Sequence, residues 1–220
     1  MRYAALLDLE TTGLDSSVDR VIEVGVCLYD LELGCPLESY AALIRSPDNG
    51  AEKINRIPVA ALVDARHAIE VWRTVSMFAY SADVIAAHNA EFDRSFVQAA
   101  GVDLQKPWVC TMADFPWDGG LRKLVEIALH HGLGVATAHR AMSDVELMAR
   151  ILTRLHEMGN SLPELFLRAA RPKKRFVAMV SYEMREVAKR VGFAWNGKEW
   201  WRMMPPEDVD GLSFRVVQRD

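Results

Sequence analysis

A short apolar run near the beginning of the chain ends in two closely spaced acids. Residues 6–13 read LLDLETTG, which predicts a strand that stops at a glycine. Because side chains at positions i and i+2 of a strand point to the same face, Asp8 and Glu10 are expected to project side by side. Two carboxylates at that spacing repel each other unless one binds a proton or a cation lies between them. Mg²⁺, which accepts carboxylate and phosphate oxygens, fits such a gap, although a solvated strand face is the simpler explanation for this pair alone.

A second stretch places polar residues at the start of a predicted helix. Residues 86–93 read AAHNAEFD after an apolar run, so Asp93 falls in the first helical turn. His88 and Asn89 follow the run and can either orient a ligand or simply cap the loop. Asp93 alone could be an ordinary surface acid, because most acids lie on solvated faces.

A third stretch precedes a later helix. Residues 139–144 read HRAMSD, with His139 five positions before Asp144. Asp144 on its own could stabilise the first turn of its helix, where the helix dipole favours a carboxylate. The three stretches together supply four acids and a histidine from separate elements, which favours a shared metal site over separate surface roles.

In these stretches the chain resembles the DnaQ-like, or DEDDh, 3'–5' exonucleases, over about residues 3–157. The family motifs match the following positions: Asp8, Glu10, Thr12 and Gly13 in the first motif, His88, Asn89, Phe92 and Asp93 in the second, and His139 and Asp144 in the third. The resemblance implies a ribonuclease H-like fold and hydrolysis of phosphodiester bonds at nucleic-acid 3' ends, with release of 5'-mononucleotides. It also implies two divalent metal ions, Mg²⁺ or Mn²⁺, as cofactors.

The same resemblance assigns roles to individual residues. Four acids are expected to bind the metal ions: Asp8, Glu10, Asp93 and Asp144. Asp8 is the expected bridge between the two ions. His139 is expected to accept the proton of the attacking water, which the ordinary pKa of histidine permits at neutral pH. Contacts to the substrate are expected from Thr11, Thr12, Gly13, Arg56, Ile57, His88, Asn89 and Phe92.

Some of these substrate contacts have plainer alternatives. Residues 11–13 could form only a tight turn, and Phe92 could belong to the core. Residues 55–58 read NRIP where relatives often carry His-Gly-Ile-Thr. The isoleucine is kept as Ile57. Arg56 replaces the glycine, and its charge could contact a phosphate.

The charge of the chain is unevenly distributed. Residues 1–170 hold 15 Lys and Arg against 23 Asp and Glu, a net charge of −8, whereas residues 171–220 hold 11 against 7, a net charge of +4. The basic part is the better candidate for contact with a polyanion. Trp195, Trp200 and Trp201 lie there among cations, and such rings can either stack on bases or form the core of a small module.

The hydrophobic pattern of residues 1–157 alternates between strands and helices, which predicts an α/β domain around one mixed five-stranded sheet. Expected strands are 3–9, 20–29, 37–44, 84–87 and 108–111, the first three as an antiparallel meander. Expected helices are 71–79, 91–99, 121–129 and 140–157. Residues 158–172 are expected to form a helix and a basic linker, and residues 173–220 a small β-α-β-β module with strands at 176–180, 193–203 and 212–217.

The sequence gives no sign of a membrane span or of a disulfide framework, because no apolar run reaches about 20 residues and the three cysteines have no C-x-x-C spacing. A cytoplasmic protein is the resulting expectation. Expected partners are DNA or RNA 3' ends, with DNA favoured, and a polymerase or repair protein, while the oligomeric state stays open. Two alternatives are an exoribonuclease of the oligoribonuclease type that trims RNA, and a non-catalytic, nucleic-acid-binding polymerase-accessory module.

Overall fold

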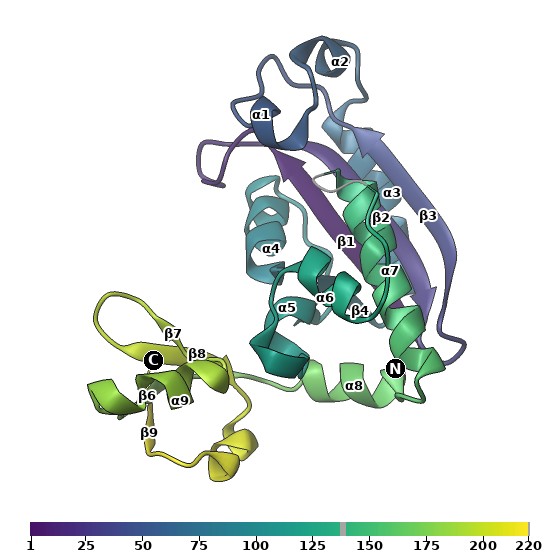
Figure 1. Ribbon diagram of the computed structural model, residues 1–220. Helices are drawn as coiled ribbons and strands as arrows, with labels where there is room; N and C mark the ends of the chain where they lie inside the picture. The colour runs from purple at the N-terminus through teal and green to yellow at the C-terminus, as the bar shows by residue number, and fades with distance from the viewer. Residues whose placement is uncertain (137–139, 220) are drawn as a thin grey trace. The chain divides into compact units, whose positions relative to one another are not determined.

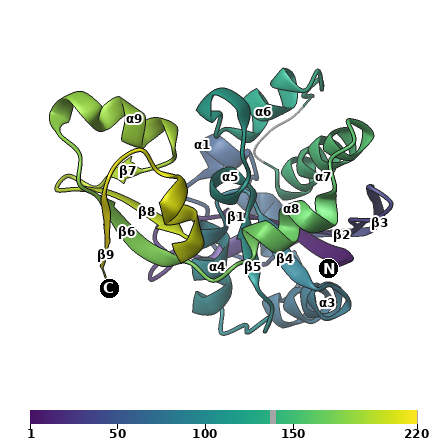
Figure 2. The ribbon, with the colours of Figure 1, turned by 90° about the horizontal axis from the view of Figure 1, so that it is seen from below.

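The computed structural model describes residues 1–136 and 140–219. The chain folds into two compact units, of which the first comprises Met1–Phe115 and Arg122–Ala170 and the second comprises Pro116–Leu121 and Arg171–Asp220. Figures 1 and 2 show the ribbon in two views. Each unit has its own sheet and its own hydrophobic core.

A mixed five-stranded sheet forms the centre of the first unit. Its strands, in the spatial order β3-β2-β1-β4-β5, are Cys35–Leu43, Val21–Asp30, Tyr3–Thr11, Val84–Ala87 and Trp108–Cys110. β1, β2 and β3 pair antiparallel, while β4 and β5 continue the sheet parallel to β1. The predicted α/β class, the mixed sheet and the antiparallel meander are therefore confirmed.

Helices cover both faces of this sheet. One cluster of buried residues joins the odd-numbered positions of β1 to α3 (Ala68–Ser81) and α4 (Ala90–Ala99). α7 (Ala141–Glu157) contacts β1, β2 and β3, and Figure 1 shows it in front of these strands with α3 behind them. Because side chains alternate along a strand, the even-numbered positions Asp8 and Glu10 face α7.

The first unit also contains shorter helices: α1 (Glu52–Asn55), α2 (Val59–Val63), α5 (Thr111–Asp114), α6 (Leu124–His130) and α8 (Leu162–Ala169). The predicted helix 121–129 begins late, because the backbone at Leu121 is extended after the 3-10 turn η1 (Asp118–Gly120). No helix in the described part of the chain has the length and apolar character needed to cross a membrane.

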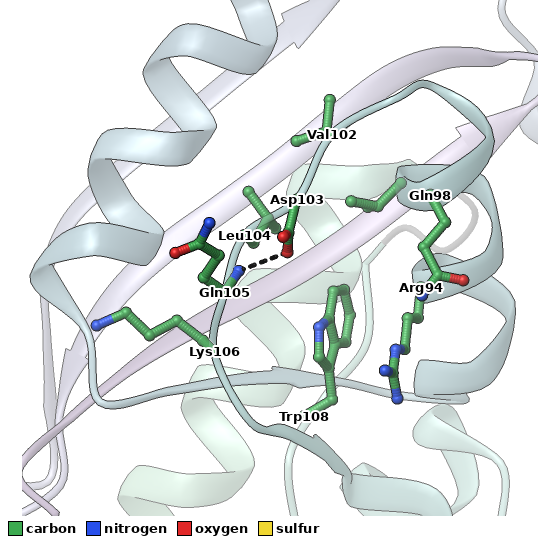
Figure 3. A pocket seen from close by; sticks show the side chains of 9 residues that line it. Arg94, Gln98, Val102, Asp103, Leu104, Gln105, Lys106 and Trp108 are labelled. Carbon is green, nitrogen blue, oxygen red and sulfur yellow. Dashed lines mark hydrogen bonds between the residues drawn. The ribbon is translucent and has the colours of Figure 1, made fainter.

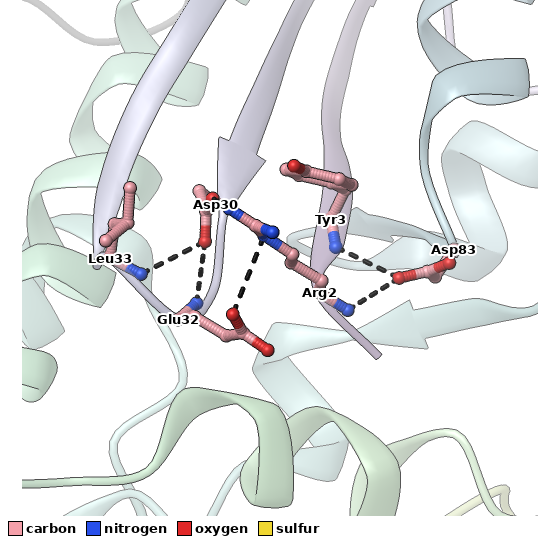
Figure 4. Close-up of polar contacts among 6 residues, drawn as sticks. All are labelled: Arg2, Tyr3, Asp30, Glu32, Leu33 and Asp83. Carbon is pink, nitrogen blue, oxygen red and sulfur yellow. Dashed lines mark hydrogen bonds and ion pairs between the residues drawn. The ribbon is translucent and has the colours of Figure 1, made fainter.

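Polar contacts fix the end of β1 that lies opposite to the acids. The backbone N–H groups of Arg2 and Tyr3 donate to the Asp83 carboxylate at 2.6 and 3.0 Å, which ties the start of β1 to the start of β4 (Figure 4). The Arg2 guanidinium donates to the buried Asp30 carboxylate at 3.1 Å, and Asp30 also accepts from the Glu32 N–H. These bonds hold β1, β2 and β4 together where β1 begins, so the register that places the acids at its other end is well determined.

The second unit contains a four-stranded antiparallel sheet in the order β7-β8-β6-β9. Its elements are β6 (Lys174–Ala178), η2 (Tyr182–Met184), α9 (Arg185–Arg190), β7 (Ala194–Trp195), β8 (Trp200–Met204), η3 (Pro206–Gly211) and β9 (Val216–Gln218), together with η1. The buried core gathers Phe176, Ala178, Ala188, Phe193 and Met204. Because Ala188 belongs to this cluster, α9 packs on the face of the sheet that carries Phe176 and Met204.

The predicted single strand 193–203 is wrong, because the chain reverses within it. β7 and β8 form an antiparallel hairpin instead. The Asn196 side chain accepts the N–H groups of Lys198 and Glu199, and Gly197 has a left-handed φ of 92°. Asparagine and glycine favour such turns, and here they stand inside an aromatic-rich run that reads as one strand.

Candidate functional site

Three carboxylates from two elements meet at one place in the first unit. Asp8 and Glu10 project from β1, and Asp144 projects from the first turn of α7. One carboxylate oxygen of each lies within 4.8 Å of the others. They come this close because α7 lies on the face of β1 that carries the even-numbered residues. The structure therefore brings together three of the predicted metal ligands.

Asp93 of α4 is the fourth predicted acid, and it is only 2% exposed. Its carboxylate accepts a hydrogen bond from the backbone N–H of Leu9, which lies between the two acids of β1. The charge of Asp93 also contributes to the raised pKa of Asp8, as expected for neighbouring carboxylates. The four acids thus converge from β1, α4 and α7.

Burial and mutual repulsion raise the pKa values of these acids. Burial, followed by the charges of Asp93, Asp144 and Glu10, raises the pKa of Asp8 well above its ordinary value. Burial is also the main reason why the pKa of Glu10 rises to about 7 and that of Asp93 to about 8. Such a cluster is stable at neutral pH when cations balance its charges. Oxygen donors at this separation fit hard divalent ions such as Mg²⁺ or Mn²⁺.

Gly25 allows α7 to approach the sheet beside Asp8. It is the β2 residue that pairs with Asp8. A Cβ atom at this position would lie 2.6–2.7 Å from backbone atoms of Ala141 and Met142, which is closer than packed atoms tolerate. Any larger residue would therefore push the first turn of α7, and Asp144 with it, away from β1.

Glu23 and Arg140 form a connection next to the four acids. Glu23 lies opposite Glu10 in the pairing of β1 with β2, and its side chain is 5% exposed. The Arg140 guanidinium donates to the Glu23 carboxylate at 2.6, 3.0 and 3.2 Å, and the Ala141 N–H donates to it at 3.0 Å. Because Ala141 is the first residue of α7, these bonds fix the start of the helix that carries Asp144.

The three sequence motifs do not include Glu23 or Arg140, although the sequence around Glu23 indicates a buried partner. Glu23 is the single charged residue in the stretch 21–29, and a lone acid in an apolar strand requires a buried partner. Burial and the charges of neighbouring acids raise the pKa of Glu10, whereas the charge of Arg140 lowers this pKa. The predicted proton acceptor His139 lies outside the described residues.

The turn after β1 is closed by its own hydrogen bonds. The Thr12 N–H donates to the Arg20 carbonyl at 2.9 Å, and the Thr12 hydroxyl donates to Asp19 at 3.0 Å. The Thr11 hydroxyl donates to the Gly13 carbonyl at 2.6 Å, and a Cβ atom on Gly13 would collide with the Asp19 carboxylate. The Thr12 N–H is therefore used within the turn, and its predicted contact with the substrate is not supported.

A buried asparagine ties the segment after β3 to this turn. The Asn55 side chain donates to the Thr11 carbonyl at 3.2 Å and accepts from the Asn49 side chain at 2.9 Å and the Ile57 N–H at 3.1 Å. All three side chains, Asn49, Asn55 and Ile57, are buried. These contacts give the segment a fixed geometry at the end of the strand that carries Asp8.

Ile57 and Arg56 have different surroundings. Ile57 is 2% exposed and packs against Ile22 and Leu62, and its contact with substrate bases stays a prediction. Arg56 is exposed and has a left-handed φ of 57°, the conformation that favours glycine. The backbone thus adopts a geometry suited to the glycine that relatives often carry here, while the guanidinium lies at the surface.

His88 makes hydrogen bonds with both ring nitrogens. Its Nε2 lies 2.6 Å from the Arg122 carbonyl oxygen and its Nδ1 lies 2.9 Å from the Thr111 hydroxyl. A carbonyl only accepts, so Nε2 carries a proton, and Nδ1 of the neutral ring accepts from Thr111. Burial lowers the pKa of His88 and favours this neutral form. His88 thus links the ends of β4 and β5 to the loop at Arg122, and its contact with a substrate stays a prediction.

Asn89 and Phe92 differ in their exposure. Asn89 is exposed at the start of α4 and has a left-handed φ of 81°, a strained conformation that is often kept at functional sites. The Phe92 ring is half-buried against the core and lies 4.8 Å from the ring of Phe96. Asn89 thus remains open to a ligand, whereas Phe92 serves the core, the alternative already open from the sequence.

A separate pocket of about 250 Å³ lies between α4 and the segment that leads to β5 (Figure 3). Arg94, Gln98, Lys106 and Trp108 contribute to its lining, which includes none of the predicted site residues. The Lys106 ammonium donates to the Ala82 carbonyl at 2.6 Å and is therefore engaged in holding the loop. This pocket is distinct from the site formed by the acids.

Two family models match the chain. Residues 6–152 match RNase_T, which is described as an exonuclease family. Residues 174–218 match DUF8626, which is described as a domain of unknown function. The first match contains all four converging acids.

Two DNA polymerase III proteins are similar to the first part of the chain. Over 169 residues, 70% of this chain, it is 28% identical to the DNA polymerase III PolC-type of Thermotoga maritima, of which the match covers 12%. Over 161 residues, 67% of this chain, it is 32% identical to the DNA polymerase III subunit epsilon of Treponema pallidum, of which the match covers 74%. The chain thus spans a small part of the PolC-type protein and most of the epsilon subunit.

Solved exonuclease structures share the fold. Exonuclease X, solved in complex with 5' overhanging duplex DNA, superposes with a TM-score of 0.57 at 24% identity over 76% of this chain and 99% of that chain. E. coli ExoI, solved in complex with single-stranded DNA, gives a TM-score of 0.64 at 16% identity over 86% of this chain and 50% of that chain. The fold is therefore ribonuclease H-like, as the resemblance implied. With a family match over residues 6–152, the chain belongs to the RNase_T family of DnaQ-like exonucleases.

Proposed function

We propose that this chain is a divalent-metal-dependent 3'–5' exonuclease that releases 5'-mononucleotides from nucleic-acid ends. The convergence of Asp8, Glu10 and Asp144 within 4.8 Å carries this proposal. Membership of an exonuclease family supports the reaction class. Two divalent ions, when bound, supply charge neutralisation at the phosphate, an acidified water and stabilisation of the leaving oxygen.

The four acids would hold these ions in different ways. Asp8, which lies among the other acids, would contact both ions. Glu10 and Asp144 would complete the first ion's site, and Asp93, held by the Leu9 N–H, would support the second. Cations held here would offset the burial and the mutual repulsion that raise the pKa values of Asp8 and Glu10.

His139 would accept the proton of the attacking water. The ordinary pKa of a histidine side chain permits this role at neutral pH. Its neighbour in the sequence, Arg140, is bonded to Glu23, and this bond fixes the point at which α7 begins. The surface residues Arg56 and Asn89 would contact the terminal nucleotides, together with Thr11 and Gly13 of the turn after β1.

DNA is the proposed preferred substrate, and a polymerase or repair protein is the proposed partner. The similarity to DNA polymerase III proteins supports both choices. Selection between DNA and RNA requires a contact that senses the 2'-hydroxyl. Residues 1–157 would form the catalytic domain, residues 158–172 a helix and linker, and residues 173–220 a small basic module.

A cleavage time course tests this proposal. Single-stranded DNA and RNA of the same sequence, labelled at the 3' or the 5' end, are incubated with Mg²⁺, Mn²⁺ or EDTA. We expect stepwise shortening of DNA from the 3' end that requires metal and falls by about 10³-fold or more in Asp144→Ala. Glu157→Ala removes an exposed acid from the other end of α7 and serves as the matched control.

The outcomes separate the alternatives. Cleavage of RNA alone would identify an exoribonuclease. Binding of both strands without cleavage of either would identify a non-catalytic accessory module and refute the proposed activity.

A further inference from the structure

The three tryptophans of the second unit have different surroundings. Trp200 packs against the core of the unit. Trp201 lies on the opposite face of β8, where the Arg175 guanidinium lies 5.6 Å from its ring centroid. Trp195 is 53% exposed. A core role therefore explains Trp200, but it does not explain Trp195.

Trp195 presents an exposed ring on a fixed support. It pairs with Trp200 across the β7–β8 hairpin, and the two ring centroids are 5.7 Å apart with the planes inclined at 52°. Trp200 in turn contacts the buried cluster that includes Phe176 and Met204. Figure 1 shows the two short strands of this hairpin next to each other. A partly exposed indole that is held in this way suits stacking with a planar ligand.

Exposed cations stand on both sides of this ring in the sequence. Lys198 lies in the turn between β7 and β8, and Lys189 and Arg190 lie in the last turn of α9. Among the described residues, none of these three side chains has an ion-pair partner. Their charges are therefore available to an anion from solution.

Arg202 connects the hairpin to α9. It lies two positions after Trp200 on the same face of β8, and its guanidinium donates to the Val191 carbonyl just beyond the end of α9. The cations in the last turn of α9 consequently lie on the same side of the sheet as Trp195 and Trp200. Stacking surface and positive charge thus share one side of this unit.

Glu199, the acid in the β7–β8 hairpin, is paired with other cations and does not neutralise Lys198, Lys189 or Arg190. Glu199 is paired with Arg175 at 2.7 Å and with Arg219 at 3.9 Å. Residues 171–220 keep a net charge of +4, while residues 1–170 carry −8. A polyanion is therefore attracted to this unit and repelled by the rest of the chain.

We propose that Trp195, Lys198 and the cations at the end of α9 bind single-stranded nucleic acid. A base would stack on Trp195, and the flanking phosphates would lie beside Lys198, Lys189 and Arg190. The combination of one fixed aromatic face with unpaired cations is typical of sequence-independent strand binding, because every base has a π-face and every nucleotide has a phosphate. The use of this surface to hold the strand during digestion rests on the proposed exonuclease function, whereas binding itself does not.

Fluorescence anisotropy with the full-length chain tests this inference. Labelled oligothymidine and oligouridine of about 12 nucleotides are titrated in EDTA, at several NaCl concentrations between about 50 and 200 mM. We expect Trp195→Ala to weaken binding about tenfold and Trp195→Phe to keep most of the affinity, because phenylalanine can still stack. Lys198→Gln should reduce the slope of log K against log salt by about 0.7. Tyr80→Ala removes an aromatic ring that is 85% exposed in the first unit, and it should change nothing.

Wild-type affinity and salt slope in both Trp195→Ala and Lys198→Gln would overturn the proposal. Self-association of the wild-type chain that Trp195→Ala abolishes, seen by sedimentation without any effect on oligonucleotide binding, would identify a protein interface and overturn it as well. Thermal unfolding of each variant checks that the second unit is folded. Binding is measured in EDTA and therefore separately from catalysis. If the unaltered chain cleaved no substrate but bound oligonucleotides in a way that depends on Trp195, only the proposed exonuclease function would be refuted. An active exonuclease with unaffected binding would refute only this inference.

Discussion

Arg140 holds the buried carboxylate of Glu23 across 117 positions of the sequence. The same carboxylate accepts a hydrogen bond from the N–H of Ala141, the first residue of α7. The pair of Arg140 and Glu23 therefore balances the charge of Glu23 and also fixes the start of α7 beside the acids. Glu23 thus has a guanidinium partner, and the four proposed metal ligands lie beside this pair. These are Asp8, Glu10, Asp93 and Asp144.

Arg140→Gln is expected to lower the free energy of unfolding by about 3 kcal/mol, because it leaves a buried charge on Glu23 without its cation. The double variant with Glu23→Gln should recover part of this loss. Urea unfolding measures both effects. Arg154→Gln, which removes an exposed pair with Glu157 on the same helix, is the control and should cost less than about 1 kcal/mol. Equal losses for Arg140→Gln and Arg154→Gln would contradict the role of the partly buried pair of Arg140 and Glu23.

Gly25→Ala is expected to destabilise the chain by about 2 kcal/mol and to reduce activity strongly. The added methyl group would collide with the backbone of Ala141 and move Asp144 away from β1. Gly134→Ala is the matched control, because a methyl group there meets no atom within 4 Å. Thermal unfolding and Mg²⁺-dependent hydrolysis are measured for both variants. If Gly25→Ala retained full activity, α7 would not need its close approach to the sheet.

Asp8→Asn should raise the melting temperature in EDTA and remove the response to metal. The substitution takes one repelling carboxylate out of a partly buried cluster, so the metal-free fold gains stability. In the unaltered chain Mn²⁺ should raise the melting temperature with increasing concentration, because it binds the folded state. Differential scanning fluorimetry with and without Mn²⁺ measures this, with Glu157→Gln as the control. A rise of the same size in both variants would exclude Asp8 as a ligand.

Without divalent ions, the chain should lose stability as the pH rises from about 5 to about 8. Burial and neighbouring acids raise the folded-state pKa of Glu10 to about 7, and burial raises that of Asp93 to about 8. The folded chain therefore keeps protons that the unfolded chain has released above about pH 4. This stabilisation is complete below the unfolded pKa values and is lost as the pH passes the folded ones. Urea unfolding in EDTA across this range measures it, and Mg²⁺ should flatten the profile. Stability that rises with pH in EDTA would contradict this account.

Arg56→Gly should weaken nucleic-acid binding while it changes the unfolding free energy by less than about 1 kcal/mol. Glycine relieves the left-handed backbone at φ 57° but increases the entropy of the unfolded chain, and the two effects nearly cancel. Loss of the surface guanidinium removes a proposed phosphate contact. Filter binding in EDTA measures the affinity, with Arg45→Gly, another replaced arginine of the same unit, for comparison. Equal affinity for Arg56→Gly and the unaltered chain would remove Arg56 from the proposed substrate contacts.

The sheet and the acids could be predicted from the sequence because local patterns encode them. β4 is a buried apolar run whose predicted bounds, 84–87, are those observed, and the side-by-side position of Asp8 and Glu10 follows from strand periodicity alone. The partner of Glu23 could not be predicted in this way. No periodicity records a contact across 117 positions, and a lone acid indicates only that some partner exists.

The predicted substrate residues show that a motif match does not give the surroundings of a side chain. Ile57 and His88 match the expected residue types and positions. Ile57, however, lies in the core, and both ring nitrogens of His88 form hydrogen bonds with protein groups. Whether a side chain is free depends on its neighbours in three dimensions. Asn196 shows the same limit for secondary structure, because its turn lies inside a run whose aromatic residues favour a strand.

The second unit draws Pro116–Leu121 from the middle of the chain, so no single cut separates the two units. The chain passes between them after Phe115, after Leu121 and after Ala170. A stop codon at residue 171 would leave the segment Pro116–Leu121 without the rest of its unit. This segment ends next to Arg122, whose carbonyl accepts the hydrogen bond from His88. The second unit is therefore built from two segments of the chain that lie far apart in the sequence. Exchange of the module between proteins by simple end-to-end gene fusion would leave one of its segments behind.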